Sequence, residues 1–95
     1  MITHIVFFKL KNPDQQTVQT TKEKLEQMMG RIPELKSLQV GVDIVRSQRS
    51  YDLALITTFD SLDDLEAYQV HPVHLEFVEY VNTVRESTVA VDFES

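Results

Sequence analysis

The chain has 95 residues, of which 42% are hydrophobic and 25% charged, with two glycines and three prolines. A chain of this length supports one hydrophobic core, so we expect a single domain over residues 1–95, and the ordinary composition excludes intrinsic disorder. Nine basic against fifteen acidic residues give a formal net charge of −6, and the basic residues are scattered, so neither a nucleic-acid partner nor docking to an anionic membrane is expected.

The first half of the chain predicts a strand, a helix and a strand. Residues 2–10 form a run rich in β-branched and aromatic side chains that is apolar on both faces, as in a strand buried on two sides. Asp14 is placed to cap a helix running to about Met29, which is followed by glycine and proline. Residues 38–44 alternate between apolar and polar, which predicts a strand with one buried face.

The second half predicts a strand and then a helix that is interrupted. Residues 51–59 form a third strand, and the short polar tract before them predicts an antiparallel hairpin with the second strand. Residues 61–64 resemble a capping box and start a helix. Pro72 disfavours helical geometry at His71 and suits the first position of a new helix, so we expect the helix to break and restart there. The residues expected to face inward from the restarted helix are Leu75, Phe77, Val78 and Val81.

The order of these elements predicts the fold class. Residues 89–93 alternate again and give a fourth strand, so the order is typical of the α+β, ferredoxin-like βαββαβ fold, with a four-stranded antiparallel sheet and helices on one face. Strands 2–10 and 51–59 are apolar on both faces, yet the chain has no further element to cover the second face. We therefore expect a homodimer in which two sheets face each other and close an α/β barrel.

The chain shows no sign of a targeting or membrane-spanning segment. The apolar run at the N-terminus is too short for a signal peptide and lacks a cleavage site. No stretch approaches the roughly 20 apolar residues that a membrane helix needs. There is no cysteine, so disulfides and thiolate chemistry are excluded. Cytoplasmic residence is expected.

A tyrosine and two histidines lie within seven residues around the predicted helix break. His74 falls in the first turn of the restarted helix, where the helix dipole disfavours the imidazolium and leaves the ring able to accept a proton. Tyr68 can donate its hydroxyl proton to a carbonyl or enolate oxygen, and a base with a donor is the minimum for abstracting a proton beside a carbonyl. We take Tyr68 and His74 as candidate catalytic residues bordering a small apolar cavity. The alternative is that both are structural.

The other histidines are candidate pocket-lining residues with structural alternatives. His71 occupies the N-cap position of the restarted helix, where a capping role is favoured. His4 lies on an otherwise apolar strand face, where a hydrogen-bonded core histidine is favoured over pocket lining. The spacing of His71 and His74 suggests a metal site with Glu66 or Glu76, but a catalytic zinc needs three protein ligands and the spacing fixes no third. We expect neither a metal nor a cofactor.

Four segments of the chain carry a resemblance to a known family: residues 2–9, residues 51–55 leading into 59–61 and 64–65, the run Tyr68…His71-Pro72-Val73-His74, and the closing residues 92–94. In these segments the chain resembles the Dabb family, the stress-responsive dimeric α/β-barrel domain. The resemblance spans essentially the whole chain. It implies the dimeric barrel, and for most members of the family the biochemical role is undefined.

One plant relative in this family, olivetolic acid cyclase, closes a linear polyketide without a metal or organic cofactor. Its catalytic tyrosine and histidine fall on the positions of Tyr68 and His74, and a histidine near its start matches His4. A further histidine in its third strand is matched here by Leu53. Two hypotheses follow: a homodimer that is non-catalytic or binds a small apolar ligand, and a cofactor-independent lyase or cyclase with His74 as base and Tyr68 as donor. A third hypothesis comes from a haem-degrading relative of similar topology, although no residue of this chain is identified as a haem ligand.

Overall fold

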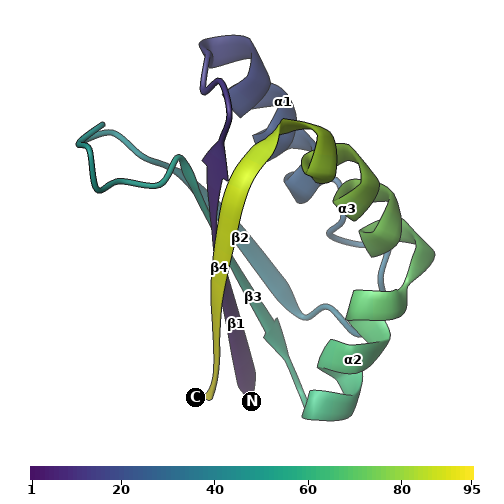
Figure 1. The fold of residues 1–95 in the computed structure, drawn as a ribbon. Coiled ribbons are helices and arrows are strands. Elements are labelled where there is room, and N and C mark those ends of the chain that lie inside the picture. The colour runs from purple at the N-terminus through teal and green to yellow at the C-terminus, as the bar shows by residue number, and fades with distance from the viewer.

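A four-stranded antiparallel sheet carries all three helices on one of its faces in the computed structural model, which describes residues 1–95 (Figure 1). The elements in chain order are β1 (Ile2–Leu10), α1 (Gln15–Glu26), β2 (Ser37–Val42), β3 (Leu53–Phe59), α2 (Leu62–Val70), α3 (Pro72–Val84) and β4 (Arg85–Glu94). The strand order across the sheet is β2-β3-β1-β4, and every neighbouring pair is antiparallel. This is the predicted ferredoxin-like fold, with the second helix divided into α2 and α3.

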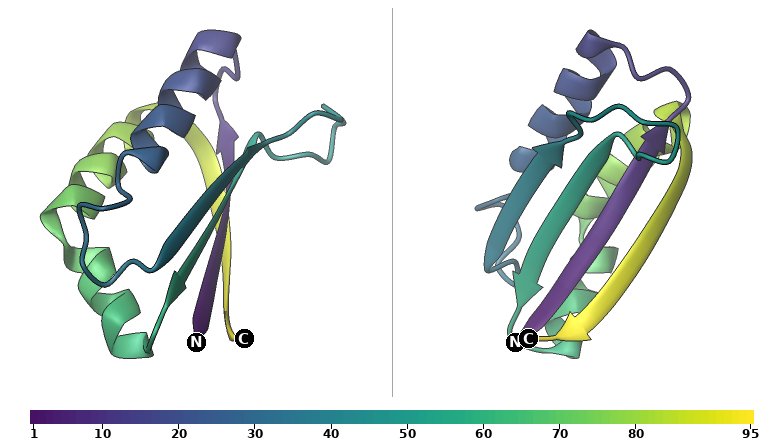
Figure 2. Two further views of the ribbon diagram at one scale, coloured as in Figure 1. Left: turned by 180° about the vertical axis from the view of Figure 1, so that it is seen from behind. Right: turned by 90° about the vertical axis from the view of Figure 1, so that its left-hand side faces the viewer.

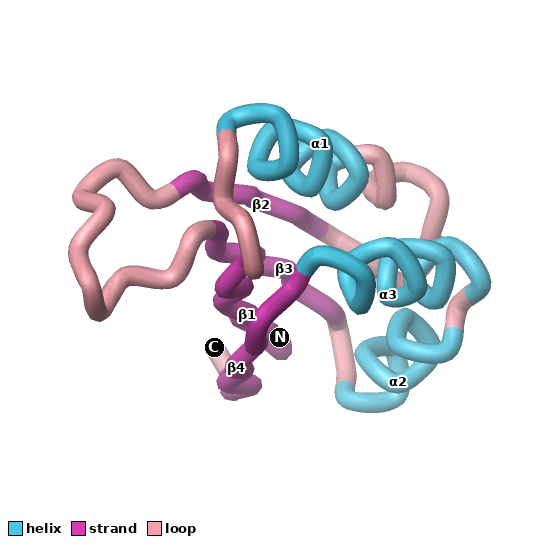
Figure 3. The backbone as a smooth tube through the Cα atoms, turned by 45° about the horizontal axis from the view of Figure 1, so that its top comes forward, coloured by secondary structure: helices cyan, strands magenta, loops and turns pink.

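The helix starts lie where the capping residues predict them. The Asp14 carboxylate accepts a hydrogen bond from the Thr17 amide at 2.7 Å and so caps α1. His71 is extended (φ −65°, ψ 138°), and its Nδ1 accepts from the Val73 amide at 3.1 Å. Pro72 fills the first position of α3. The predicted break at His71 therefore redirects the chain between α2 and α3 (Figure 3).

Two details of the helices differ from prediction. α1 ends at Glu26 rather than near Met29, because the amides of Met28 and Met29 bond to carbonyls three residues earlier and tighten the chain into turns. Leu75 was expected to face inward but is 50% exposed, whereas Phe77 is buried. Leu75 and Phe77 are at positions i and i+2, which lie on opposite sides of a helix, so only one of them can face the core. None of the three helices is long and apolar enough to cross a membrane.

Three strand boundaries also differ from prediction. β3 begins at Leu53 rather than at residue 51, because its pairing with β1 starts at the Leu53–Phe8 pair. β2 ends at Val42, and Ile44 lies in the following loop with 90% of its surface exposed, because the chain leaves the sheet there. β4 begins at Arg85, directly after α3 and earlier than the predicted start at Val89. Its extra residues continue the pairing with β1, and the Lys11 amide bonds to the last carbonyl of α3 at 2.9 Å.

The core lies between the helices and the face of the sheet that they cover. It consists of Ile2, Phe8, Leu10, Leu25, Met28, Ile32, Leu35, Leu53, Leu55, Phe59, Leu65, Tyr68, Phe77 and Val81. The even-numbered residues of β1 and the odd-numbered residues of β3 supply its sheet side, as the alternation along both strands predicts. This arrangement places His4 on the helix-covered face as well.

The opposite face of the sheet is covered by no element of the chain (Figure 2, right). Its apolar side chains are those of Ile5, Phe7, Ala54, Ile56, Val89, Val91 and Phe93, which we call the open apolar face. Phe7 is 43% exposed and Val91 62%. The loop between β2 and β3 projects on this same side, away from the helices (Figure 1). β1 and β3 are thus apolar on both faces, as predicted, but only one face is covered.

Candidate functional site

A cavity of about 220 Å³ lies between the helix-covered face of the sheet and α2 and α3. Its lining residues are His4, Val6, Phe8, Leu55, Tyr68, His74, Phe77, Val78, Val81, Asn82, Arg85 and Thr88. Most of this lining is aliphatic or aromatic, and the polar groups are few, which is the usual composition of a small-molecule site. The two candidate catalytic residues, Tyr68 and His74, therefore line one cavity together with His4.

Tyr68 is completely buried, and aromatic rings pack around it. Its ring centroid lies 4.4 Å from that of His74, 4.9 Å from that of Phe59 and 6.2 Å from that of His4, with the His4 ring edge-on. The Tyr68 hydroxyl has no hydrogen-bond partner in the protein. Burial raises the pKa of Tyr68 well above its usual value, so the phenol stays protonated and remains a hydrogen-bond donor.

The orientation of His74 is fixed by the carbonyl of Gln69, which lies 3.0 Å from Nδ1. A carbonyl only accepts, so Nδ1 carries the proton and Nε2 of the neutral ring is an acceptor. Burial lowers the pKa of His74, the nearby His4 lowers it further, and the bond to the Gln69 carbonyl acts in the opposite direction. The ring is therefore neutral, as the sequence predicts. The largest cause is desolvation, whereas the sequence pointed to the helix dipole.

His4 is oriented in the same way by a carboxylate on the neighbouring strand. β4 pairs with β1 so that Asp92 lies opposite His4, and Nδ1 of His4 donates to the Asp92 carboxylate. His4 is 7% exposed, and in the neutral ring this bond leaves Nε2 as the acceptor. The sequence analysis did not identify Asp92 as part of this site. Asp92 could have been found by pairing the first and last predicted strands as antiparallel neighbours.

Three further polar residues complete the lining: Asn82 and Arg85 at the end of α3, and Thr88 on β4. Asn82 and Arg85 lie beside the cavity, and the Arg85 Nε donates to the Asn82 Oδ1 at 2.9 Å. Arg85 was not predicted from the sequence as a site residue. The cavity thus presents two oriented imidazole acceptors, one phenol donor and one guanidinium on an apolar background, which can bind a ligand oxygen or move a proton beside it.

His71 does not line this cavity, although it was expected with His4 as a pocket residue. Its ring turns back to accept from the Val73 amide, because the residue before a proline is held extended and its side chain reaches the first turn of the helix. No group of three or more His, Asp or Glu side chains is arranged to hold a metal ion.

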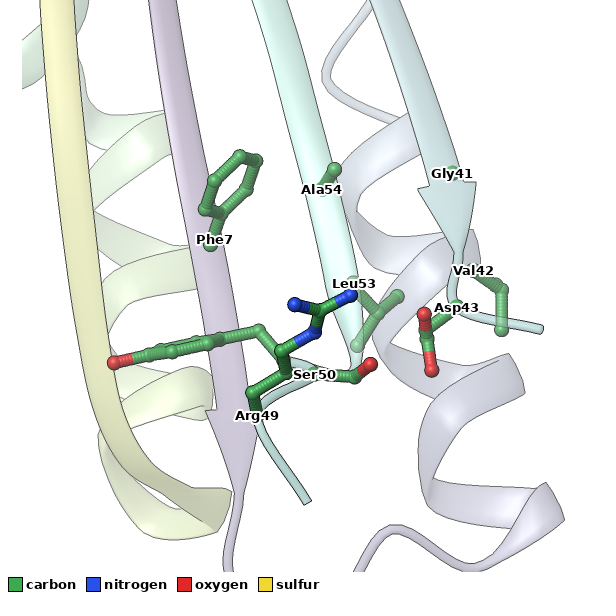
Figure 4. Close-up of a pocket in the computed structure, with 9 residues that line it drawn as sticks. Phe7, Gly41, Val42, Asp43, Arg49, Ser50, Leu53 and Ala54 are labelled. Atoms are coloured by element: carbon green, nitrogen blue, oxygen red, sulfur yellow. The ribbon is translucent and has the colours of Figure 1, made fainter. Parts of the chain in front are cut away.

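A second depression of about 380 Å³ lies on the other side of the sheet. Figure 4 shows Phe7 and Ala54 projecting from β1 and β3 away from the helices, with Arg49 of the β2–β3 loop at its edge. It contains no histidine. Because it continues the open apolar face, we associate it with contacts to another chain rather than with chemistry.

The fold and the cavity define an α+β, ferredoxin-like domain with a small, mostly apolar site between sheet and helices. The family model described as "Stress responsive A/B Barrel Domain" (Dabb) matches residues 2–95. The chain therefore belongs to the Dabb family. No curated protein matches the chain.

Solved structures with the same fold are similar over nearly the whole chain. A dimeric ferredoxin-like protein of unknown function from Bacteroides fragilis is 28% identical, with a TM-score of 0.87, covering 99% of this chain and 95% of that one. A dimeric ferredoxin-like protein of unknown function from Thermobifida fusca is 29% identical, with a TM-score of 0.88 and coverages of 99% and 90%. A hydroxynitrile lyase from Passiflora edulis is 24% identical, with a TM-score of 0.82 and coverages of 97% and 90%; this likeness concerns the fold alone.

Proposed function

We propose that this chain is a homodimeric Dabb domain that binds a small, largely apolar ligand in the cavity beside Tyr68 and His74. The observation that carries the proposal is the Tyr68 hydroxyl, a fully buried donor without a partner on a residue of the cavity lining. An unpaired buried hydroxyl costs about 1–3 kcal/mol and is rare in folded proteins. A ligand oxygen that accepts from Tyr68 would recover this hydrogen bond.

The homodimer is supported by the open apolar face and by the comparisons. Val89 is 46% exposed and Phe93 43%, next to Phe7 and Val91 on the same surface. Contiguous exposed apolar surface of this kind marks interaction sites in soluble proteins. The two relatives at 28% and 29% identity are dimeric proteins with this fold. A second copy laid sheet to sheet would bury the face that the helices leave uncovered.

The ligand proposal is tested by screening fragments that carry a carbonyl or hydroxyl on an apolar body, with two-dimensional NMR as the readout. Binding should shift the signals of Tyr68, His74 and Val81, which line the cavity. Tyr68→Phe should weaken the fragments that bind. If no fragment at millimolar concentration shifts these signals, or if Tyr68→Phe binds every fragment as well as the wild type, the proposal is wrong.

A second candidate function is a cofactor-independent lyase or cyclase, favoured by the orientation of the His74 ring. With its Nδ1 bonded to Gln69, the Nε2 of His74 can take a proton from a carbon beside a ketone carbonyl. The electron pair of that C–H bond then forms a carbon–carbon double bond, the π pair of the carbonyl moves to its oxygen, and Tyr68 donates a hydrogen bond to that enolate oxygen. If no further reaction follows, the enolate takes a proton back, and the abstracted hydrogen is thereby exchanged with solvent.

Hydrogen exchange separates the catalytic candidate from simple binding. Acetophenone in heavy water should exchange its methyl hydrogens faster with the wild-type protein than in buffer. His74→Asn should abolish the acceleration, because its amide can still donate to the Gln69 carbonyl but leaves no basic nitrogen. Exchange no faster than in buffer, with acetophenone bound in the cavity, would leave ligand binding as the function.

A further inference from the structure

Arg85 is the only fixed positive charge in the lining of the cavity, and the lining contains no carboxylate. Asp92 is bonded to His4 but does not itself line the cavity. The lining therefore carries one fixed positive charge in a protein whose net charge is −6.

The guanidinium of Arg85 is held in place but is not neutralised. Its Nε donates to the Asn82 side chain at 2.9 Å, one helical turn earlier. The salt bridges of the molecule involve other cations, and Arg46, for comparison, contacts both Asp43 and Asp52. The two Nη amino groups of Arg85 are thus free to donate to an anion. Their fork geometry fits the two oxygens of a carboxylate.

Arg85 lies opposite Leu10 in the pairing of β4 with β1, six residues along β1 from His4. The aliphatic and aromatic residues among the lining are Val6, Phe8, Leu55, Phe77, Val78 and Val81. A ligand that bonds to both Arg85 and Tyr68 would therefore have an anionic end, an apolar body and an oxygen that accepts from Tyr68. Apolar burial supplies affinity, and the two polar ends set the orientation.

We propose that the ligand of this cavity is a small organic carboxylate, with its carboxylate on the Nη groups of Arg85, its apolar body against the hydrophobic lining and a second oxygen on Tyr68. The inference deepens the ligand-binding function proposed above and rests on it. It assigns Arg85 the role of selecting an anion over a neutral molecule of the same shape.

The test compares benzoate with benzamide, which has nearly the same shape and no charge. Titrations followed by NMR and calorimetry would use the wild type, Arg85→Gln and, as a matched control on the open side of the sheet, Arg49→Gln. A charge-assisted bidentate bond is expected to make benzoate bind about tenfold tighter than benzamide. Arg85→Gln should remove this preference by weakening benzoate alone, and Arg49→Gln should keep it.

The outcomes separate this inference from the function on which it rests. If benzamide shifts the NMR signals of the cavity residues and binds as tightly as benzoate, the inference of a carboxylate ligand is wrong and the proposed ligand-binding function is supported. If neither probe shifts them at millimolar concentration, or if benzoate shifts only residues 41–54 of the open side, both are wrong. Should Arg85→Gln fail to fold, Arg85→Lys is the second variant: it keeps the charge but loses the planar fork, so a reduced preference is expected and a full one contradicts bidentate binding.

Discussion

The phenol of Tyr68 is surrounded by the rings of His4, Phe59 and His74, yet its hydroxyl has no partner in the protein. Removing an unpaired buried polar atom removes its desolvation cost. We expect Tyr68→Phe to raise the free energy of unfolding of the ligand-free protein by about 1 kcal/mol while it weakens ligand binding. Chemical denaturation measures the first effect, and fragment titration measures the second.

Tyr80 provides a matched control for this experiment. Its hydroxyl is hydrogen bonded to the Thr21 hydroxyl at 2.9 Å. We expect Tyr80→Phe to lower the free energy of unfolding by about 1 kcal/mol, because a satisfied bond is lost. If Tyr68→Phe destabilises the protein as much as Tyr80→Phe, the Tyr68 hydroxyl has a structural partner and the argument from its unpaired state fails.

His74 makes the stability of the protein depend on pH. Burial holds its pKa below the usual value of 6.5, so between the two pKa values the unfolded chain binds a proton that the folded chain does not. Stability therefore rises with pH in this range, and it is lost as the pH falls below the unfolded value towards the folded one. Urea denaturation at a series of pH values from neutral to mildly acidic should show that the free energy of unfolding falls more steeply for the wild type than for His74→Asn. Equal slopes for the two proteins would contradict a depressed pKa at His74.

At the scale of the elements, Asp52 fastens the β2–β3 loop to the end of β1. Its side chain is 5% exposed, accepts from the Leu10 amide at 2.7 Å and contacts the Arg46 guanidinium at 2.9 Å. Arg46 has a left-handed backbone (φ 57°) and a side chain that is 44% exposed. The loop is therefore held by one buried acceptor that serves two elements.

The two ends of this contact should differ in their effect on stability. Asp52→Ala leaves the buried Leu10 amide without an acceptor and should lower the free energy of unfolding by about 1–3 kcal/mol. Arg46→Ala removes a partly exposed charge and should cost less than about 1 kcal/mol. Thermal or urea denaturation of both variants measures the difference. Equal costs would show that the ion pair, rather than the bond to Leu10, holds the loop.

The elements also show how far the sequence predicts the structure. Caps and breaks depend on neighbouring residues, so Asp14 and the interruption at His71 were predictable, and so was the face on which each strand is buried. Asp92 and Arg85 were not identified, because their roles depend on how β4 pairs with β1. Asp92 lies 88 positions from His4 along the chain, and no local pattern relates them. The convergence of Tyr68 and His74 on a cavity likewise required the packing of α2 and α3 on the sheet.

At the scale of the whole molecule, the ligand cavity and the proposed dimer interface lie on opposite sides of one sheet. The cavity lies between the sheet and α2 and α3, and the open apolar face lies on the uncovered side (Figures 1 and 2). A second copy placed on the open face would leave the helices and the cavity lining untouched. Dimerisation and ligand binding should therefore be separable by substitution.

Val91 is the residue on which this separation can be tested. It is 62% exposed in the middle of β4, an edge strand, so a lysine there costs the isolated chain little. In a sheet-to-sheet dimer the same lysine would be desolvated among apolar side chains at a cost of several kcal/mol. We expect the wild type to be a dimer and Val91→Lys a folded monomer, as measured by size-exclusion chromatography with light scattering and by NMR.

Val70→Lys is the matched control, since Val70 is 68% exposed but ends α2 on the helix side of the sheet. It should remain a dimer, because its position is remote from the open apolar face. The Val91→Lys monomer should bind benzoate with the affinity of the wild type, since residues of one chain form the cavity lining described above. A dimeric Val91→Lys protein would place the interface elsewhere, and a monomer that no longer binds benzoate would show that the cavity depends on the second copy.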